Sequence, residues 1–439
     1  VRGGMYQMKK SAVVVFAIAI VLMATSFSFA GGFIDKPVNV IGPEEAAPWA
    51  KIECLSDAAP GFVFEEFHPQ CKQTHTVLKS AFMSEEPHSK YFLLHYAPGW
   101  DKKTDKTPVL LVHGAGSHAF HSWAHPYFMQ APDPKNIEKP GLMQFLVEKG
   151  YPVFAITFSH PHGDNFLQAQ QLANAIGRIK TVLNGGADFK VDIVCHSKGA
   201  MATRIYLSDI SDQYEKYKWI TPFKNDVRKV VFVASPLRGL DTSYRYYAYS
   251  LTVMLKDIGA PMAPKSLVYM GGIIDLKDYN KKFPGQDQML NNWVRDGIDF
   301  NRQSYTADMN LTMHALYNGG DTTLLCSEGI DSAIKKSGNV IETLCRKGID
   351  PSVTAFILAG TKQDIDNIQI GPWKIPVGEM ADHSDGVLFL KSAIYKRGLT
   401  ARGAKVEAVK TVKTHHVGLI VLPEALNFIE GALSGRDNN

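Results

Sequence analysis

Short runs of hydrophobic residues, separated by amphipathic stretches, mark the middle of the chain. Nearly every position is apolar in the runs at 108–112, 152–158, 191–195, 229–234 and 353–359. Such continuous hydrophobicity is typical of strands buried on both faces of a parallel sheet. Residues 166–183, between two of these runs, instead carry apolar side chains at helical spacing. Strands and helices therefore alternate, which predicts an α/β fold with a mostly parallel sheet flanked by helices.

The two ends of the chain extend this pattern. Residues 31–60 are rich in Pro, Gly and Ala and predict an extended lead-in. The short runs at 76–78 and 91–96 predict the first, antiparallel strands of the sheet. At the C-terminal end, residues 405–412 predict the last strand and residues 423–433 a closing helix.

The N-terminal residues have the pattern of an export signal. Met8-Lys9-Lys10 precedes a mostly apolar run at 12–24, and small residues occupy the third-last and last positions of Ser28-Phe29-Ala30. A basic region, an apolar region and such small residues predict a cleavable secretory peptide ending at Ala30. An uncleaved anchor is the alternative, but a spanning helix needs about 20 apolar residues. The protein is therefore expected to be secreted or periplasmic.

A long segment interrupts the alternation after the run at 229–234. The next buried strand begins at residue 353, whereas connections in compact domains run mostly to about 4–6 residues. Apolar stretches at 244–255 and 288–294 predict helices in between, so we expect an inserted helical cap. The expected divisions of the chain are a signal peptide at 1–30, a lead-in with the first strands at 31–107, the first part of the core at 108–239, the cap at 240–350 and the second part of the core at 351–439.

The charge balance narrows the classes of function. The 439 residues include 47 basic and 43 acidic side chains, which gives a formal net charge of +4. This small excess provides no basic stripe of the kind that nucleic-acid binding requires. Nucleic acid is therefore not expected among the partners of this protein.

The chain contains five cysteines, and export would place them in an oxidising environment where disulfides can form. Cys54 and Cys71 are 17 residues apart, and Cys326 and Cys345 are 19 residues apart. Two local disulfides between these residues, with Cys195 left as a buried free thiol, are the simplest arrangement in such a compartment. Each loop closure of this length would contribute about 3 kcal/mol to stability. Crossed pairs and four free thiols are the alternatives.

The strongest chemical signal is the sequence Cys-His-Ser-Lys-Gly at 195–199. It joins an apolar run to residues that favour a helix from Ala200 onward. A strand, a sharp turn and a helix would expose the Ser197 hydroxyl at the positive end of the helix. Gly199 supplies the small residue that this geometry needs, whereas Cys195 stands where the G-x-S-x-G pattern has glycine. The pattern predicts a nucleophile elbow, and an ordinary polar turn is the alternative.

A serine nucleophile needs a base that takes its proton and a group that orients the base. The order Ser, Asp, His, with the histidine after the last strand, is typical of α/β-hydrolases. Asp385 precedes the last predicted strand, and His415 and His416 follow it. Asp364 and Asp366, which follow the preceding strand, are the alternative acids, and His415 is the alternative base.

Five short motifs follow one another along the chain. They are Val-His-Gly-Ala-Gly at 112–116, the predicted elbow, Ala-Ser-Pro-Leu-Arg-Gly at 234–239, Ser-Asp-Gly-Val at 384–387 and His-Val-Gly-Leu-Ile at 416–420. In this order they resemble the secreted bacterial true lipases of the α/β-hydrolase superfamily. The resemblance spans roughly residues 105–430 and leaves the cap unmatched.

This resemblance implies a carboxylic ester hydrolase of the lipase or carboxylesterase type, without a cofactor. It makes Ser197 the nucleophile and His416 the base. It makes Asp385 the acid, since this residue lies in a Ser-Asp-Gly sequence where the family has Asn-Asp-Gly. The backbone N–H groups of Ala115 and Lys198 would form the oxyanion hole.

The resemblance also implies a lipid or polyester substrate and contact with a lipid interface. A polyhydroxyalkanoate-type depolymerase is the close alternative, because exported depolymerases share this core. A non-catalytic binding protein on a hydrolase scaffold is the alternative of another class, although such a protein is expected to have lost a triad member. Three residues depart from the family: Cys195 replaces Gly or Ala, Lys198 replaces an uncharged residue, and Gly418 replaces the aspartate through which some relatives bind calcium.

Two groups of neighbouring residues raise the question of a metal site. They are His118, His121 and His125, and His160, His162 and Asp164. Imidazole and carboxylate are zinc ligands, but these spacings match no helix-borne pair such as H-E-x-x-H. We therefore predict neither a metal nor a cofactor, and expect these residues to line loops at the carboxyl-terminal edge of the sheet.

Overall fold

The computed structural model describes residues 36–57, 59, 61–62, 65, 72–124, 141–241, 284–299, 317–321, 326–362, 367–370, 372–376 and 381–435. The predicted signal peptide and much of the predicted cap lie outside the described residues, and so do Cys71, His125, Asp364 and Asp366. Within the described part of the chain, no helix is long and apolar enough to cross a bilayer.

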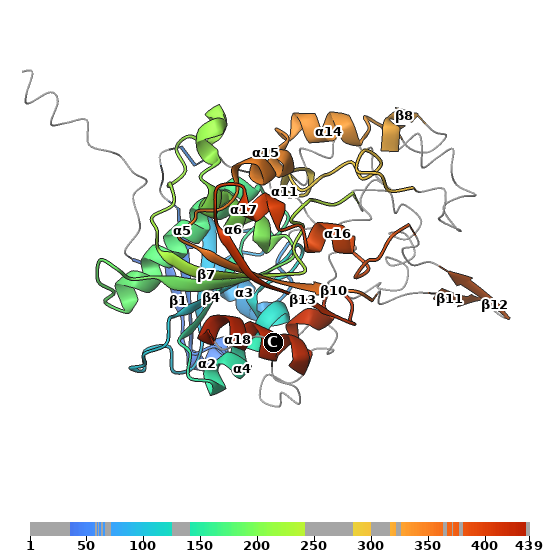
Figure 1. The fold of residues 1–439 in the computed structure, drawn as a ribbon. Coiled ribbons are helices and arrows are strands. Elements are labelled where there is room, and N and C mark those ends of the chain that lie inside the picture. Colours follow the sequence, from blue (N-terminus) through green and yellow to red (C-terminus); the bar gives the residue numbers. More distant parts are fainter. Residues whose placement is uncertain are drawn as a thin grey trace, which may run out of the picture.

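A nine-stranded sheet forms the centre of the fold (Figure 1). Its strands lie in the order β1-β2-β3-β5-β4-β6-β7-β10-β13. Their bounds are β1 Asn39–Ile41, β2 Lys51–Ser56, β3 Tyr91–Tyr96, β4 Val109–Val112, β5 Val153–Phe158, β6 Val191–His196, β7 Val227–Val233, β10 Thr354–Gly360 and β13 Lys405–Val412.

The sheet is parallel from β5 to β13. Each neighbouring pair in the series β5, β4, β6, β7, β10 and β13 is parallel. The pairs β1–β2, β2–β3 and β3–β5 are antiparallel. This arrangement confirms the predicted α/β-hydrolase fold, and each of the five continuous hydrophobic runs forms one of its parallel strands.

Helices cover both faces of this sheet (Figure 1). On one face, α5 (Asn165–Val182) and α6 (Gly199–Ser208) pack together and share a buried apolar cluster with the strands. On the other face, α3 (Thr76–Phe82), α4 (Leu142–Glu148) and α18 (Pro423–Ser434) bury their apolar sides in a second cluster. The helices predicted at 166–183 and 423–433 are confirmed as α5 and α18.

Shorter elements complete the described structure. The short helices are α2 (Pro43–Ala46), α11 (Pro284–Asp287), α14 (Ile330–Lys336), α15 (Val340–Lys347), α16 (Leu390–Ala393) and α17 (Arg397–Thr400). Two antiparallel pairs lie outside the large sheet: β8 (Gly320–Asp321) with β9 (Cys326–Ser327), and β11 (Asn367–Ile370) with β12 (Trp373–Pro376). A π-helical turn forms at Phe120–Ala124, and 3-10 turns form at Ser211–Gln213, Glu215–Tyr217 and Gly418–Ile420.

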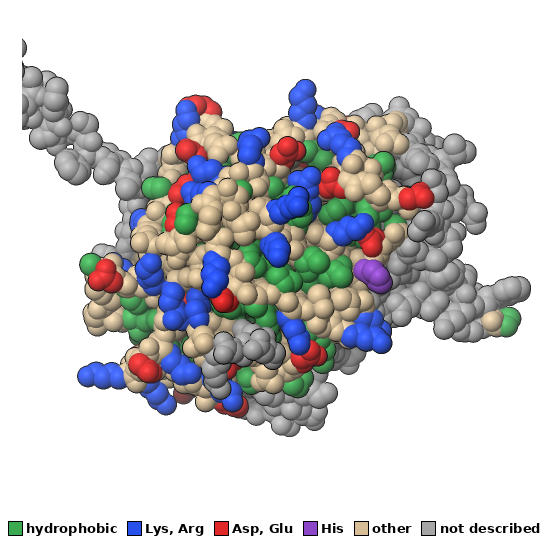
Figure 2. Space-filling model, in the orientation of Figure 1, with side chains coloured by type: hydrophobic (Ala, Val, Ile, Leu, Met, Phe, Trp, Pro, Cys, Tyr) green, Lys and Arg blue, Asp and Glu red, His purple; other side chains and the backbone are tan. Residues whose placement is uncertain are grey.

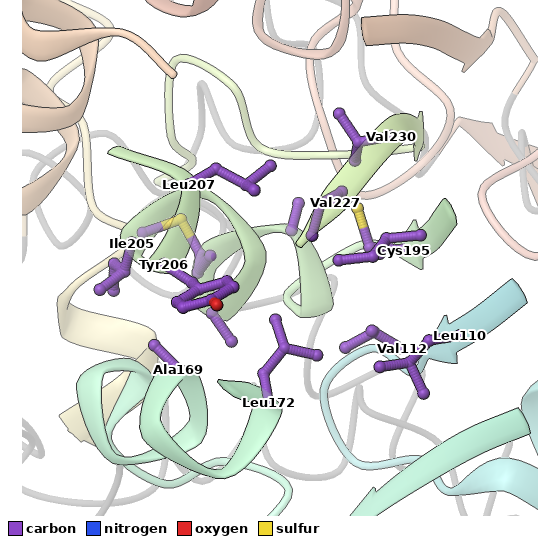
Figure 3. Packing of buried hydrophobic residues seen from close by; sticks show 14 of the residues in the cluster. Leu110, Val112, Ala169, Leu172, Cys195, Ile205, Tyr206, Leu207, Val227 and Val230 are labelled. Atoms are coloured by element: carbon purple, nitrogen blue, oxygen red, sulfur yellow. The ribbon is translucent and has the colours of Figure 1, made fainter. Parts of the chain in front are cut away.

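The strand β6 shows why these runs are hydrophobic at nearly every position. Ile193 and Cys195 belong to the cluster beneath α5 and α6, while Val194 belongs to the cluster on the opposite face. Figure 3 shows Cys195 on the sheet with Val112, its partner on β4, and Leu172 on a helix that covers them. Successive side chains of a strand point to opposite faces, and here both faces are buried.

Two regions near the N-terminus differ from the predictions. The run at 76–78, predicted as a strand, begins helix α3, because Leu78, Ala81 and Phe82 bury one side at helical spacing. The predicted extended lead-in instead contains β1, α2 and β2, and both strands belong to the sheet. In β2, Glu53 interrupts the run of apolar residues that would have predicted a buried strand. This residue is buried and forms an ion pair with Arg178 of α5. The strand predicted at 91–96 is confirmed as β3.

The described part of the predicted cap includes the segment at 284–299. Residues 288–294, predicted as helical, form a turn and a loop after α11 instead. Backbone hydrogen bonds explain the difference, since Leu240 N donates to Met289 O and Asn291 N donates to Leu240 O. These bonds pair the first residue of the predicted cap with residues 289–291 and take the place of a continuing helix.

Figure 2 shows one face of the molecule, with Lys and Arg side chains spread over it and Asp and Glu among them. The described residues on this face therefore form no single basic stripe. This mixture agrees with the formal net charge of +4.

The predicted disulfides are absent. Cys54 and Cys345 are free thiols, as is Cys195. The Cys54 side chain is directed from β2 into the apolar core, and Cys345 is half-buried on α15. The predicted pairs of Cys54 with Cys71 and of Cys326 with Cys345 are therefore wrong, because sequence spacing gives a loop length but not a side-chain direction. The prediction that Cys195 is a buried free thiol is confirmed.

We expect Cys54 and Cys195 to resist a thiol reagent in the folded protein. Both side chains are 0% exposed, and burial raises the pKa of each thiol to about 12, so the reactive thiolate is scarce. Alkylation with iodoacetamide, followed by peptide mass spectrometry without reductant, should modify both residues only after unfolding. Cys345 is the comparison that reacts sooner, and recovery of Cys54 in a disulfide would contradict its position in the core.

Candidate active site

Ser197 occupies a sharp turn between β6 and α6. Its φ is +52°, in the left-handed region that residues other than glycine rarely adopt. The N–H of Ser197 donates to the carbonyl oxygen of Val233 on β7 at 3.0 Å, and its carbonyl oxygen accepts from the N–H of Ala200 at 3.0 Å. The predicted strand, turn and helix are therefore present, with the serine at the apex.

Two glycines allow this turn to form. A Cβ on Gly199 would lie 2.5 Å from the carbonyl oxygen of His113 and 2.7 Å from that of Val112. A Cβ on Gly114 would lie 2.9 Å from the Cβ of Ser197. The loop after β4 and the turn after β6 are therefore in direct contact, and only glycine fits between them.

Cys195 fits at a position where the elbow pattern has glycine. Its side chain points away from the turn into the core, with its Sγ 3.6 Å from the carbonyl oxygen of Val231 on β7. A compact, weakly polar side chain is suited to such a buried site. The substitution therefore leaves the turn itself unchanged.

His113 fixes the peptide between Gly114 and Ala115. The ring Nδ1 donates to the Gly114 carbonyl oxygen at 2.7 Å, and the ring Nε2 accepts from the N–H of Phe158 at 3.1 Å. Burial lowers the pKa of His113 to about 4, so the ring is neutral and fills one donor and one acceptor role. Because the C=O and N–H of a trans peptide point in opposite directions, the Ala115 N–H is turned away from this ring.

Asp385 and His416 are hydrogen-bonded to each other. His416 Nδ1 lies 2.8 Å from Asp385 Oδ2, and the His416 backbone N–H donates to the Asp385 carbonyl oxygen at 2.9 Å. Asp385 Oδ1 accepts from the N–H groups of Val387 and Leu388 at 3.0 and 2.8 Å. Burial alone would raise the pKa of Asp385, but His416 and these N–H groups hold it below its ordinary value. The carboxylate is therefore ionised and orients the imidazole.

The fold brings this pair together at the carboxyl ends of β10 and β13. β10 ends at Gly360, where an added Cβ would lie 3.0 Å from the Cβ of Asp385. Of the two adjacent candidate histidines, His416 is the one whose ring is bonded to this carboxylate. The alternative acids Asp364 and Asp366 lie outside the described residues.

His196 connects the serine turn to the loop that carries His416. Its Nε2 donates to the His416 carbonyl oxygen at 3.2 Å, and the centroids of the two rings are 4.8 Å apart. Burial and the neighbouring His416 lower the pKa of His196 to about 3, so this ring is neutral. Since His196 directly precedes Ser197, its contacts place the His416 loop beside the turn.

Lys198 directly follows the serine, and its side chain is buried. It is 1% exposed, and its Nζ donates to the Oε1 of Gln168 on α5 at 2.6 Å. The residue after Ser197 is thus attached to the helix that packs against α6.

The described histidines that were considered as zinc ligands do not gather at one point, although two of them are neighbours. The rings of His118 and His121 lie together with centroids 4.0 Å apart, whereas His162 is hydrogen-bonded to Gln286 at 2.8 Å. Asp164 begins α5 by accepting from the N–H of Phe166 at 2.9 Å. Within the described ranges, no group of three or more His, Cys, Asp or Glu residues is arranged to hold a metal ion.

Two histidines that shape this site received no role from the sequence. His113 and His196 belong to the Val-His-Gly-Ala-Gly and Cys-His-Ser motifs, in which only Ala115 and Ser197 were assigned a function. Each of these histidines lies at the end of an apolar, buried strand, and a buried imidazole needs hydrogen-bond partners nearby. This position in the sequence could have indicated that each ring bonds to a neighbouring loop.

Comparison with known protein families matches part of this chain to a lipase family. Residues 106–254 match a family model described as lipase (class 2). The matched region contains β4, the serine turn and β7. No curated protein matches the chain at a significant level.

Solved structures of lipases and esterases are similar to this chain at low identity. Candida antarctica lipase A in its closed state is 12% identical, with a TM-score of 0.44 over 93% of this chain and 84% of that one. EstA from Clostridium botulinum is 14% identical, with a TM-score of 0.41 over 78% and 90%. The mature form of Bacillus licheniformis lipase BlEst2 is 14% identical, with a TM-score of 0.36 over 75% and 93%. At these scores, the fold assignment rests on the strand order described above.

Replacing Gly199 with alanine should destabilise the protein. The added Cβ would meet backbone oxygens at the end of β4, so we expect the free energy of unfolding to fall by about 1–3 kcal/mol. Denaturant unfolding followed by circular dichroism measures this change. Gly186→Ala is the matched control, because no heavy atom lies within 4 Å of its added Cβ. An equal loss in the two variants would contradict the close contact at Gly199.

Proposed function

We propose that the chain is a lipase or carboxylesterase of the α/β-hydrolase superfamily and that it hydrolyses carboxylic esters through Ser197, His416 and Asp385. The class 2 lipase match supports ester hydrolysis as the reaction class. One observation carries the assignment of residues: the 2.8 Å hydrogen bond between Asp385 and His416, next to the left-handed turn at Ser197.

In the first half of the proposed reaction, the Ser197 hydroxyl attacks the ester carbonyl carbon while His416 Nε2 takes the hydroxyl proton. Asp385 accepts from Nδ1–H of His416, which selects the required tautomer and stabilises the imidazolium that forms. The carbonyl oxygen becomes negatively charged and accepts from the N–H groups of Ala115 and Lys198. The N-terminus of α6, which begins at Gly199, adds a favourable partial positive charge.

Collapse of this intermediate breaks the ester C–O bond. The leaving alcohol takes the proton from His416, and the acyl group remains on Ser197 as a second ester. Water then attacks the acyl carbon while His416 takes a proton from it. Return of that proton to the Ser197 oxygen releases the carboxylic acid and regenerates the enzyme.

We also propose a lipid or polyester as the natural ester, and export as the location. The five lipase-like motifs support the substrate class, and the basic, apolar and small-residue pattern that ends at Ala30 supports export.

A fluorophosphonate probe should label the wild-type protein and leave Ser197→Ala unlabelled. The probe reacts with an activated serine hydroxyl, which the alanine variant lacks. Intact-protein mass spectrometry measures one added phosphonyl group per chain. An unlabelled wild type, or equal labelling of Ser197→Ala, would reject the serine mechanism.

The substitution Asp385→Asn should lower kcat for ester hydrolysis by about 10⁴-fold, because an amide selects the wrong imidazole tautomer. Hydrolysis of p-nitrophenyl butyrate measures the loss. Asp382→Asn, in the same loop and paired with Lys391, is the matched control and should stay near the wild-type rate. A near-normal rate for Asp385→Asn, with a large loss for Asp364→Asn, would make Asp364 the acid.

Activity should be higher on water-insoluble esters than on soluble ones. A lipid or polyester hydrolase gains binding energy from the apolar chain of its substrate. Rates on a series of triacylglycerols, below and above their solubility limit, and on a polyhydroxybutyrate film separate the two substrate types. Highest activity on short, dissolved esters would overturn the proposed substrate class and leave a carboxylesterase.

A further inference from the structure

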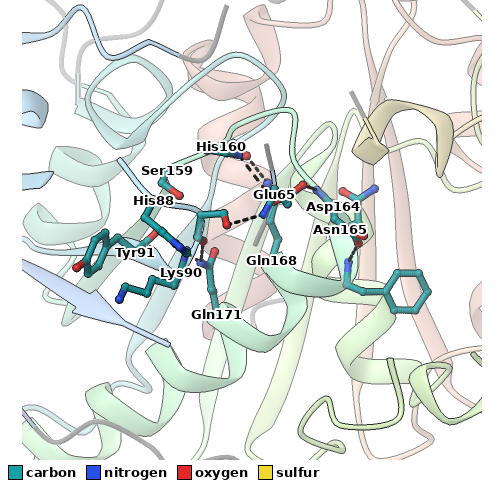
Figure 4. A network of polar contacts seen from close by, with 12 residues as sticks. Glu65, His88, Lys90, Tyr91, Ser159, His160, Asp164, Asn165, Gln168 and Gln171 are labelled. Carbon is teal, nitrogen blue, oxygen red and sulfur yellow. Dashed lines mark hydrogen bonds and ion pairs between the residues drawn. The ribbon is translucent and has the colours of Figure 1, made fainter. Parts of the chain in front are cut away.

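A cluster of polar and charged side chains lies against the serine turn and has no part in the proposed triad. We name it the elbow cluster, and it consists of Glu65, Asp164, Gln168, Lys198 and Tyr217. Figure 4 shows Glu65, Asp164 and Gln168 of this cluster, where the start of α5 meets the lead-in. The cluster therefore joins segments that are far apart in the sequence.

Lys198 places a positive charge inside this cluster. Its Nζ is held by Gln168 Oε1 at 2.6 Å, and Gln168 Nε2 donates in turn to the carbonyl oxygen of His160 at 2.8 Å. An ammonium group that is 1% exposed needs hydrogen bonds and a neighbouring negative charge.

Glu65 supplies that charge, and Asp164 lies next to Glu65. Glu65 Oε1 accepts from the N–H of Asp164 at 2.6 Å, and Asp164 Oδ1 accepts from Gln288 Nε2 at 3.0 Å. Burial and the Asp164 charge raise the pKa of Glu65 to about 7, while the positive charges of Lys198 and Lys216 oppose this increase. Lys216 Nζ also lies 3.6 Å from Asp164 Oδ2. The two lysines thus offset part of the negative charge of the two acids.

Helix α11, within the predicted cap, packs against the Lys198 side chain. A Cβ on Gly285 would lie 2.5 Å from the Cε of Lys198 and 2.0 Å from the carbonyl oxygen of Gly163. Asn165 Nδ2 donates to the Gly285 carbonyl oxygen at 2.7 Å, which ties α11 to the start of α5. The lysine side chain is therefore confined at its Cε as well as at its Nζ.

We propose that Lys198 is a positioning residue for ester hydrolysis, whose anchored ammonium group holds its own backbone N–H in place as an oxyanion donor. This inference rests on the proposed function. Because Nζ and the backbone N–H belong to one residue, fixing the first restricts the second. The φ of +52° at the preceding Ser197 makes such restriction necessary, since a strained conformation persists only where its surroundings determine it.

An oxyanion donor acts mainly on the transition state, where charge develops on the carbonyl oxygen. A displaced N–H therefore lowers kcat more than it changes KM. Misplacement by about 1 Å is enough to cost about 10²-fold in rate.

The substitution Lys198→Met tests this role, because it retains a linear apolar stem and removes the ammonium group. We expect kcat for p-nitrophenyl butyrate to fall about 10–100-fold with KM changed less than about 3-fold. The affinity for butylboronic acid, which forms a tetrahedral adduct with an active-site serine, should fall by a similar factor. An unchanged kcat in the folded variant would overturn the proposal.

A double variant separates positioning from charge balance. Both variants are compared at pH 9, above the pKa of about 7 of Glu65. There Lys198→Met leaves the acids short of one positive charge, and Glu65→Gln removes one negative charge. Combining them should restore thermal stability relative to Lys198→Met alone, while kcat stays low because the anchor is still missing. Recovery of kcat together with stability would show that Lys198 only balances charge, and the proposal would fail.

A second variant decides the case if Lys198→Met does not fold. Gln168→Met removes the acceptor that holds Nζ but leaves the lysine and both acids. The matched control is Gln171→Met, a buried glutamine on the same helix that donates to the carbonyl oxygen of Ser89 at 2.8 Å. We expect a lower kcat for Gln168→Met than for Gln171→Met, and equal values would overturn the proposal.

Counting active sites with the fluorophosphonate probe keeps two failures apart. Wild type that neither reacts with the probe nor cleaves esters would reject the proposed function and this inference with it. An active wild type, together with a Lys198→Met variant in which every active site reacts with the probe and kcat is normal, would reject only the positioning role.

Discussion

The left-handed backbone at Ser197 is the constraint on which the rest of the site depends. A residue other than glycine at a φ of +52° costs of the order of 1–3 kcal/mol and needs support from its surroundings. That support comes from the sheet: β7 accepts the Ser197 N–H through Val233, and the end of β4 leaves room only for glycine at position 199. The parallel order of β4, β6 and β7 therefore fixes the turn, and the local sequence at 195–199 permits it.

Two neutral histidines connect this turn to the loops around it. His113 holds the Gly114 carbonyl on one side, and His196 holds the His416 carbonyl, 220 residues away in sequence, on the other. Burial keeps the pKa of His113 at about 4 and that of His196 at about 3, so both rings are uncharged at neutral pH. This matters for catalysis, because a charged neighbour would oppose the positive charge that the proposed mechanism develops on His416. The site thus keeps its hydrogen bonds without adding a competing cation.

The parts of the fold that the sequence predicted are those with one dominant physical signal. Continuous hydrophobic runs identified the parallel strands, because both faces of each strand are buried. The strand β2 was not predicted because Glu53 interrupts its apolar pattern. The ion-pair partner of Glu53, Arg178, is 125 residues away in the sequence. The disulfides failed for a related reason, since the direction of the Cys54 side chain depends on the sheet that β2 joins. The candidate triad was accessible because its residue types and order are constrained by chemistry, whereas the supporting contacts of His113 and His196 depend on tertiary structure.

Stability alone does not account for a buried lysine beside the nucleophile. Apolar residues of similar volume often stabilise a protein as well as a buried ion pair does. The two kinds of side chain differ in how strictly they define their surroundings. An ammonium group requires its acceptor and its counter-charges at defined positions, whereas an apolar side chain can pack in several ways. At Lys198 these positions are set by Gln168 and Asp164, in and at the start of α5, and by Glu65 from a distant part of the chain. The backbone next to Ser197 is therefore specified by charge as well as by packing, at a turn where a small shift would move one of the two proposed oxyanion donors.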